Sequence, residues 1–405
     1  MRFIFGNYIL DTTRRELRQG AAAIDVEPQV FDLLTCLVSH RDRVVSKDDL
    51  LTAVWRGRIV SEATLNSRIN SARRAIGDTG KKQQLIKTLT RRGLRFVGKV
   101  EVEEDTIAAV PGSEIARPHP TELPAQEIRF IRTPDGVRLA MAAVGNGQPV
   151  VKVTNWLNHL EYDWLSPVWS PLLAHLTARF HLVRYDGRGF GLSDWDVTDL
   201  GFDAQVADLE TVVDTTGLER FALLGISGGV AVAIAYAARH PERVSRLVLF
   251  GGFPHGWFKR GSAAEIEQAE ALLTMIRHGW GRDDDSAFHR LFTALFAPGG
   301  TLAQIEWFKD LQRVSTSPEN AARLAHIFGQ IDVADLLPQI AVPTLIMHSR
   351  QDARVPFEQA LMLARGILHA RLVALESRNH LLLSHEPAWP SFIEQLCGFL
   401  NKTPH

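Results

Sequence analysis

The pattern of hydrophobic and polar positions in residues 1–100 predicts a small mixed domain, called the head below. Short alternating runs come first and predict an antiparallel sheet, at residues 3–5, 8–10 and 21–26. Hydrophobic positions at helical spacing then predict three helices, over residues 28–40, 47–54 and 62–76. Two further β-like runs, 85–89 and 94–97, enclose a basic turn and predict a hairpin.

The pattern after the head predicts a linker and a second, larger domain. Residues 101–126 are acidic and then proline-rich, without a hydrophobic period, which is typical of an extended tether. Residues 127–402, called the body, alternate between β-like and helical runs, so we expect an α/β fold with a mainly parallel sheet. An aromatic-rich insertion at about 253–340 is not needed by that sheet and predicts a helical cap.

Charge divides the chain in the same way as hydrophobicity. Residues 1–99 carry 19 Lys and Arg against 10 Asp and Glu, whereas the remainder carries 26 against 36. The net charge of −1 therefore conceals a basic head and an acidic body. A basic domain of this kind indicates a polyanionic partner.

Composition also predicts the cellular compartment of the protein and whether it binds a metal or a cofactor. Cys36 and Cys397 lie in amphipathic helical patterns and indicate buried thiols in a reducing compartment, so we expect a cytoplasmic protein. The start of the chain shows no signal-peptide pattern. The uncharged stretch 221–238 is interpreted as a buried strand and helix, because it contains a glycine turn, and no membrane association is expected. No ligand spacing for a metal is visible, and we expect neither metal nor cofactor.

The third predicted helix of the head has two opposite faces. One face is apolar and points to a core, with Leu65, Ile69, Ala72 and Ile76. The other face carries hydrogen-bonding side chains able to contact base edges, at Ser67, Asn70 and Arg74. Basic residues within reach of phosphates flank it in the helix and the hairpin, at Arg68, Arg73, Arg91, Arg92 and Arg95. A plain solvated helix face is the alternative, but the helix–helix–helix–basic hairpin order favours binding of double-stranded DNA.

The order and spacing of these motifs resemble a known DNA-binding family. The run 46–55, the run 64–78 and the hairpin 86–96 are similar to the winged helix-turn-helix domain of OmpR/PhoB-type regulators, also found in ToxR- and CadC-like proteins. The resemblance covers the whole head. Its hairpin departs from the family because the tip is more basic and Phe96 stands where Tyr is common. The resemblance implies operator binding, and we expect a homodimer.

In the body, the pentapeptide Gly225-Ile226-Ser227-Gly228-Gly229 fits G-x-S-x-G between a β-like run and a helical run. Such a strand–turn–helix context exposes a nucleophilic serine on a turn that requires glycine at its flanks. Asp352 and His380 follow later β-like runs, in the order Ser, Asp, His. We therefore expect Ser227 to act as nucleophile, His380 as base and Asp352 as the carboxylate that orients the imidazole.

These motifs, together with the run 185–194 after a predicted strand, resemble the α/β-hydrolase family over nearly the whole body. The resemblance places one half of an oxyanion hole at the Gly228 amide. The second donor is either the backbone of Trp156 or the side chain of Asn155, because the usual His-Gly pair is missing. The expected ligand pocket comprises Asn155, Trp156, Trp257, Phe258, Trp280 and Trp307, which favours an apolar, aromatic or acyl ligand.

Three functions remain open at this point. The first is a transcription regulator that senses a small molecule through its hydrolase-like body. The second is a serine hydrolase of esters, amides or lactones that carries a DNA-binding head. In the third the body only dimerises the head, for which neither a triad nor an aromatic cap is needed. Fold alone does not separate them, since hydrolase folds also serve as receptors.

Overall fold

The computed structural model describes residues 2–402 except 13–15, 21, 25, 42, 48, 51–53, 55–61, 81, 90–92, 104–122 and 282–286. The chain divides into two compact units, Met1–Ala116 and Arg117–His405. Each unit has a hydrophobic core of its own. The division falls inside the segment that the sequence predicts as a linker.

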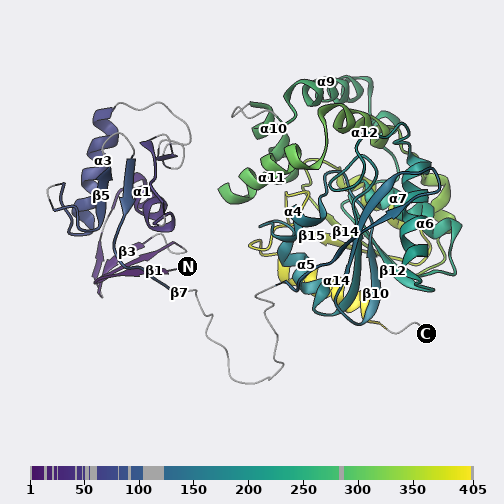
Figure 1. The fold of residues 1–405 in the computed structure, drawn as a ribbon, viewed down its shortest axis with the longest axis horizontal. Coiled ribbons are helices and arrows are strands. Elements are labelled where there is room, and N and C mark those ends of the chain that lie inside the picture. The colour runs from purple at the N-terminus through teal and green to yellow at the C-terminus, as the bar shows by residue number, and fades with distance from the viewer. Residues whose placement is uncertain are drawn as a thin grey trace. The chain divides into compact units, whose positions relative to one another are not determined.

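The head consists of an antiparallel sheet, helices and a separate two-stranded hairpin (Figure 1). The order of its strands is β4 (Ala22–Ile24), β3 (Glu16–Gln19), β2 (Tyr8–Asp11), β1 (Arg2–Phe5) and β7 (Glu101–Glu103). Two helices contact each other, α1 (Pro28–Ser39) and α3 (Glu62–Ala75). The hairpin is formed by β5 (Ile86–Leu89) and β6 (Gly93–Phe96). The predicted helix 47–54 lies partly outside the described residues.

Two details of the head depart from, or add to, the sequence pattern. β7 pairs with β1, so residues 101–103 belong to the sheet of the head and not to the linker. In the hairpin, Gly93 has φ +129° and approaches Val45 so closely that an added Cβ would lie 2.0 Å from the Val45 carbonyl oxygen. Glycine is therefore required there, because Leu94 and Val45 exchange backbone hydrogen bonds that attach the hairpin to the domain.

The body is built on one sheet whose strand order is β15-β14-β13-β12-β10-β11-β9-β8. Its strands are β8 (Ile128–Arg132), β9 (Arg138–Val144), β10 (Gln148–Lys152), β11 (Phe180–Tyr185), β12 (Phe221–Ile226), β13 (Val244–Phe250), β14 (Thr344–Ser349) and β15 (Ala370–Leu375). All neighbours pair in parallel except β8 with β9 and β9 with β11. The predicted α/β fold with a mainly parallel sheet is confirmed.

Helices cover the sheet because the connections between parallel strands must cross its faces. They are α4 (Leu160–Trp164), α5 (Ser170–Thr177), α6 (Phe202–Thr216), α7 (Gly229–Arg239), α13 (Phe357–Gly366) and α14 (Trp389–Leu400). α6 packs on α7 at one face, and α5 contacts α14 at the other (Figure 1). The uncharged stretch 221–238 forms β12 and most of α7. Within the described residues, none of the helices has both the length and the apolarity needed to cross a membrane.

Between β13 and β14 the chain leaves the sheet and forms the cap. Its helices are α8 (Trp257–Arg260), α9 (Ala263–Gly279), α10 (Ala287–Phe296), α11 (Leu302–Ser315) and α12 (Pro318–Gln330), followed by the 3₁₀ helix η1 (Ala334–Gln339). α9 to α12 gather at one end of the body (Figure 1). Trp280, Phe292 and Phe308 are each less than 4% exposed, so much of the aromatic content of the insertion is the cap's own core.

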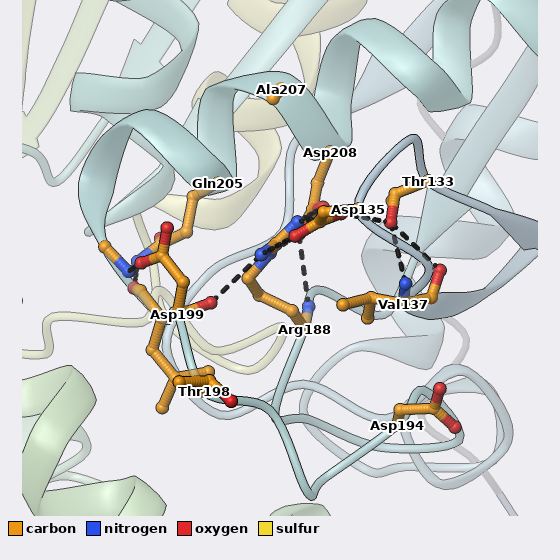
Figure 2. Close-up of polar contacts among 12 residues, drawn as sticks. Thr133, Asp135, Val137, Arg188, Asp194, Thr198, Asp199, Gln205, Ala207 and Asp208 are labelled. Carbon is orange, nitrogen blue, oxygen red and sulfur yellow. Dashed lines mark hydrogen bonds and ion pairs between the residues drawn. The ribbon is translucent and has the colours of Figure 1, made fainter.

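A buried arginine organises the loop after β11. Figure 2 shows Arg188 between Asp208 on α6 and Asp135 in the turn between β8 and β9. Its guanidinium donates to Asp208 at 2.7 and 2.9 Å and to the Asp199 carbonyl at 3.0 Å. Arg188 is 2% exposed, and a buried charge is tolerated only when paired in this way. The loop signature 185–194 is thus a structural anchor of the fold.

Candidate active site

The turn between β12 and α7 holds Ser227 in a strained backbone conformation. Ser227 has φ +53°, in the left-handed region that a residue with a side chain rarely adopts. The glycines on either side are required by space: an added Cβ would lie 2.9 Å from the Gly229 oxygen at Gly225 and 2.5 Å from the Thr154 oxygen at Gly229. Packing therefore imposes the geometry of a nucleophile elbow on this segment.

Ser227, His380 and Asp352 form a continuous chain of hydrogen bonds. The Ser227 hydroxyl donates to His380 Nε2 over 2.8 Å, and His380 Nδ1 donates to Asp352 Oδ2 over 2.7 Å. The three residues follow β12, β15 and β14, whose parallel pairing brings their carboxyl ends to one edge of the sheet. This is the arrangement that lets a histidine take the proton of a serine and keep the correct tautomer.

Surrounding groups hold the imidazole and the carboxylate in place. The His380 backbone N–H donates to the Phe296 carbonyl, and the Phe296 ring meets the imidazole edge-on with centroids 5.6 Å apart. Asp352 Oδ1 accepts from the backbone N–H groups of Arg354 and Val355. Burial of the Asp352 carboxyl opposes ionisation, but the charge and hydrogen bond of His380 and the Val355 donor outweigh it, so the pKa of Asp352 is lowered. Asp352 is therefore an anion at neutral pH.

The loop after β10 carries the proposed second half of the oxyanion hole. The peptide N–H groups of Trp156 and Gly228 have no hydrogen-bond acceptor among the described residues, and both residues border the pocket beside Ser227. Asn155 is used elsewhere: its Oδ1 accepts from Lys152 Nζ at 2.6 Å, and its Nδ2 donates to the carbonyls of Trp156 and Leu157. Of the two alternative donors, the backbone of Trp156 is the one left available.

Buried charges beneath this loop fix its shape. Lys152, Asp163 and Asp186 are each no more than 6% exposed. Burial lowers the pKa of Lys152 to about 8 and raises the pKa of Asp163 to about 6 and that of Asp186 to about 7. Asp186 accepts from the Asn158 side chain, and Asn158 in turn accepts from the Thr154 hydroxyl. Hydrogen bonds to buried groups thus hold both ends of the loop that presents the Trp156 N–H.

The pocket in front of Ser227 is small and mixed in character. It is lined by Trp156, Ser227, Gly228, Phe253, Trp257, Arg260, Phe328, Arg354 and Val355. The space in it that a water molecule can occupy is about 20 Å³, room for about one water. The walls are aromatic, as the sequence predicts, but two arginines interrupt them. Side chains of the cap must therefore shift before a larger compound enters.

Several residues predicted to line the pocket lie elsewhere. Trp280 is buried behind Trp156, with ring centroids 5.9 Å apart, and its Nε1 donates to the Thr316 carbonyl. Trp307 stacks on Tyr162 with centroids 5.7 Å apart. Phe258 packs on Trp257 and His326, and Asn155 belongs to the loop network. Among the predicted lining residues, only Trp156 and Trp257 border the described pocket.

The lining residues that the sequence reasoning missed are Phe253, Arg260, Phe328, Arg354 and Val355. One signal was available for two of them, because Arg354 and Val355 follow Asp352 within three positions and share its loop. No local pattern distinguishes Arg260 or Phe328 from the rest of the cap. Within the described residues, no group of three or more His, Cys, Asp or Glu side chains is placed to hold a metal ion.

In the head, α3 presents the predicted polar stripe to solvent. Ser67, Asn70 and Arg74 are exposed. Arg68 is half-buried, with Nε donating to Gln29 Oε1 at 3.1 Å and an ion pair to Glu27. Arg95 is exposed, and its Nε donates to the Arg41 carbonyl at 3.2 Å. The other two hairpin arginines, Arg91 and Arg92, lie outside the described residues.

Arg73 corrects the prediction made for the same helix. Its side chain is 6% exposed, and its guanidinium donates to the Ile86 carbonyl at 3.1 Å and to Thr88 Oγ1 at 2.7 Å. Because Arg73 is next to the apolar face of α3, its side chain points into the domain and attaches α3 to β5. Arg73 is thus a structural link between helix and hairpin and is not available to a phosphate.

The two folded units and the Ser–His–Asp chain define a protein with a small α+β head fused to a body of hydrolase fold. Residues 162–387, more than half of the chain, match the family described as alpha/beta hydrolase fold, and the chain belongs to this family. Residues 21–96 match the family described as transcriptional regulatory protein, C terminal. Both resemblances drawn from the sequence, to a winged-helix DNA-binding domain and to an α/β hydrolase, are confirmed at this level.

Individual relatives match the body. It is similar to the AB hydrolase superfamily protein YisY of Bacillus subtilis, 28% identical over 264 residues that cover 62% of this chain and 91% of that protein. It is also similar to the pimeloyl-(acyl-carrier protein) methyl ester esterase of Nitrosomonas europaea, 27% identical over 239 residues, or 58% of this chain and 90% of that protein. Among solved structures, an esterase from Exiguobacterium antarcticum superimposes with a TM-score of 0.56 at 26% identity, covering 67% of this chain and 99% of that one.

Proposed function

We propose that the protein is a transcription regulator whose body is a working serine hydrolase and senses the compound that it hydrolyses. The observation that carries the proposal is the hydrogen-bond chain from Ser227 through His380 to Asp352, with links of 2.8 and 2.7 Å. A body that served only to dimerise the head would need neither this chain nor the strained backbone of Ser227.

The proposed reaction uses this geometry. His380 Nε2 takes the proton of Ser227 as Oγ attacks the carbonyl carbon of an ester, amide or lactone. Asp352 stabilises the imidazolium that forms, and the peptide N–H groups of Gly228 and Trp156 stabilise the developing oxyanion. His380 then protonates the leaving group, and water releases the acyl group from Ser227 by the same steps in reverse order.

A second function is a hydrolase whose head only places it on DNA. The complete triad favours this alternative, and the relatives of the body carry the names of hydrolases and esterases. The exposed stripe of Ser67, Asn70 and Arg74 favours the regulator, because a stripe of hydrogen-bonding side chains is suited to reading base edges. The two functions differ in whether pocket and operator are energetically coupled.

The hydrolase part is tested with a fluorophosphonate probe on the full chain. The probe should modify Ser227 in the wild type, and Ser227→Ala should remove all labelling because, among the described residues, His380 hydrogen-bonds to no other hydroxyl. Ser391→Ala, which changes an exposed serine on α14, serves as the matched control and should label like the wild type. A folded wild-type protein that resists the probe would contradict the proposal.

The regulatory part is tested on the same labelled protein. Operator sites are first selected from random DNA with the full chain, and affinity is then compared before and after labelling. An occupied pocket should change operator affinity by about fivefold or more, the usual size of an allosteric coupling. Ser227→Ala treated with the probe controls for nonspecific modification. Equal operator affinities of labelled and unlabelled protein, together with rapid hydrolysis of phenyl acetate, would favour the hydrolase alternative.

A further inference from the structure

Two arginines from distant parts of the sequence line the pocket. Arg260 ends the cap helix α8, whereas Arg354 lies two residues after Asp352 on the loop following β14. Both border the same cavity as Ser227. The remaining lining residues are aromatic or aliphatic, apart from Ser227 and Gly228.

Neither guanidinium has a carboxylate partner among the described residues. Arg354 stacks against Trp257, 4.6 Å from the ring centroid, and against Phe296 at 5.7 Å, and its side chain donates no hydrogen bond to any described residue. Arg260 lies 5.4 Å from the Phe253 centroid and donates only to the His255 carbonyl. Neither forms an ion pair with a carboxylate within the described parts of the chain.

The nearby carboxylates are engaged elsewhere. Asp352 accepts from His380 and from two backbone N–H groups of its own loop. Glu265, the other acidic group near Arg260, accepts from the Ser262 backbone N–H at the start of α9. Both arginines line the pocket whereas neither of these carboxylates does, so the charge on the pocket wall is positive.

The charge state of Arg354 is consistent with a positively charged pocket. Burial and the neighbouring charge of Arg260 lower the pKa of Arg354 to about 10, although Asp352 opposes the change. Arg354 therefore remains charged at neutral pH, in a half-buried place where charge is costly unless paired. The reaction adds a further positive charge when His380 becomes an imidazolium, which two unpaired arginines oppose.

We propose that Arg260 and Arg354 form an anion-binding subsite, and that the compound hydrolysed at Ser227 carries a carboxylate. This inference rests on the proposed hydrolase function and specifies its substrate class. A guanidinium offers a planar fork that matches a carboxylate, and the aromatic rings leave its edges as the donating surface. A bound carboxylate neutralises the excess charge of the pocket before the imidazolium forms.

The resulting reaction is the hydrolysis of a half-ester of a short dicarboxylic acid or of a related carboxylate-bearing ester. The ester C–O bond breaks, Ser227 Oγ is acylated, and water then releases the second carboxyl group, so one water is consumed and no electrons are exchanged. Ser227 and both arginines border the same pocket, so the ester and the carboxylate of one compound must lie close together, which favours a short chain between them.

The test compares two substrates that differ only in the anionic group. Methyl hydrogen succinate carries a carboxylate where methyl succinamate carries a neutral amide of the same shape. The full chain should hydrolyse the anionic ester with a kcat/KM at least about tenfold higher, the effect of charge-assisted hydrogen bonds. Release of methanol gives the rate for both.

Variants then assign the preference to the arginines. Arg260→Gln and Arg354→Gln should each reduce the ratio of the two kcat/KM values about tenfold, and Arg354→Lys should restore part of it. Arg350→Gln is the matched control, because Arg350 is exposed, pairs with Glu376 and does not border the pocket among the described residues. Labelling of Ser227 in each variant shows that the triad remains assembled. Hydrolysis of both esters with an unchanged ratio in the variants would overturn the subsite and leave the hydrolase function standing.

A binding measurement separates the two proposals when neither ester turns over. Calorimetry on Ser227→Ala should detect succinate binding that Ser227→Ala/Arg354→Gln loses, while the added Arg350→Gln change leaves it intact. Loss of binding in the Arg354 variant alone supports the subsite even without catalysis. Absence of succinate binding, or tighter binding of inorganic phosphate than of succinate, would overturn the assignment to a carboxylate.

Discussion

The head and the body build their candidate sites in opposite ways. In the head, Ser67, Asn70 and Arg74 lie on one helix and point to solvent, so each side chain acts almost independently. In the body, Ser227, Asp352 and His380 follow three different strands and meet in a buried chain of hydrogen bonds. A helix face tolerates the loss of one member, whereas a triad acts as a unit and does not.

Two arginines show how the same residue type serves each site differently. Arg73 lies beside the polar stripe in sequence but is buried and attaches α3 to the hairpin. Arg354 lies beside the triad in sequence and faces the pocket with an unpaired guanidinium. Charge did not distinguish the two positions. Spacing placed Arg354 on the loop of Asp352 but did not give the direction of its side chain, because that direction depends on what packs against it.

The largest expected effect tests whether the three triad residues of the body act as a unit. His380→Ala should reduce the rate of fluorophosphonate labelling at Ser227 by at least about 10³-fold, because the hydroxyl loses its base. His385→Ala, which changes an exposed histidine on the same segment, should label normally. His380→Gln, with circular dichroism of both variants, separates loss of the base from misfolding. Labelling at the wild-type rate in His380→Ala would show that Ser227 is activated in another way.

The next effect concerns stability of the head. Arg73→Ala removes two charge-assisted hydrogen bonds and should lower the free energy of unfolding of the head by about 2–3 kcal/mol. Arg74→Ala, at the adjacent exposed position, should leave this quantity nearly unchanged. Hydrogen exchange of the head's amides in the full chain measures both. Equal stabilities of the two variants would argue against Arg73 as a structural link.

A smaller effect tests the independence of side chains on the helix face. Asn70→Ala or Arg74→Ala should weaken binding to the selected operator by about 1–3 kcal/mol and change binding to random DNA little, as loss of a base contact does. Gln19→Ala, an exposed change on β3, serves as control. Equal losses on both kinds of DNA would show that these residues contact phosphates and do not read bases.

A last comparison distinguishes the two domains by how their stability depends on pH. In the head, burial of Asp78 opposes ionisation, but four backbone N–H donors outweigh it and lower its pKa. Its contribution to stability is present above the ordinary pKa of an aspartate and is lost as pH falls. In the body, burial raises the pKa of Asp186 to about 7, so the folded state keeps a proton that the unfolded state has released. Stability from this group falls as pH rises from about 4 to 7.

Hydrogen exchange as a function of pH in the full chain measures both slopes. Asp78→Asn should remove the acid-side loss in the head, and Asp186→Asn should flatten the decline in the body, each changing the slope of stability against pH by on the order of 1 kcal/mol per pH unit. Slopes of the same sign in the two domains would contradict the assignment of opposite protonation states to these buried carboxylates.

The sequence by itself determined the features that depend on neighbours in the chain. The glycines around Ser227 predict a tight turn, because a Cβ at Gly225 or Gly229 would collide with the backbone. The alternation of β-like and helical runs predicts a parallel sheet. The order Ser, Asp, His follows from the same alternation. The apolar face of the third predicted helix in the head was likewise readable from its period, and Leu65 and Ile69 are buried on α3.

Only the tertiary structure decided which side chains face the pocket and which support it. Trp280 and Trp307 share the composition of the cap with Trp257, yet they stack behind other aromatic rings. Arg73 turns inward because β5 offers it acceptors, and Arg260 at the end of α8 borders the same pocket as Ser227. The direction of these side chains depends on contacts between segments far apart in sequence, so no local period or spacing predicts it.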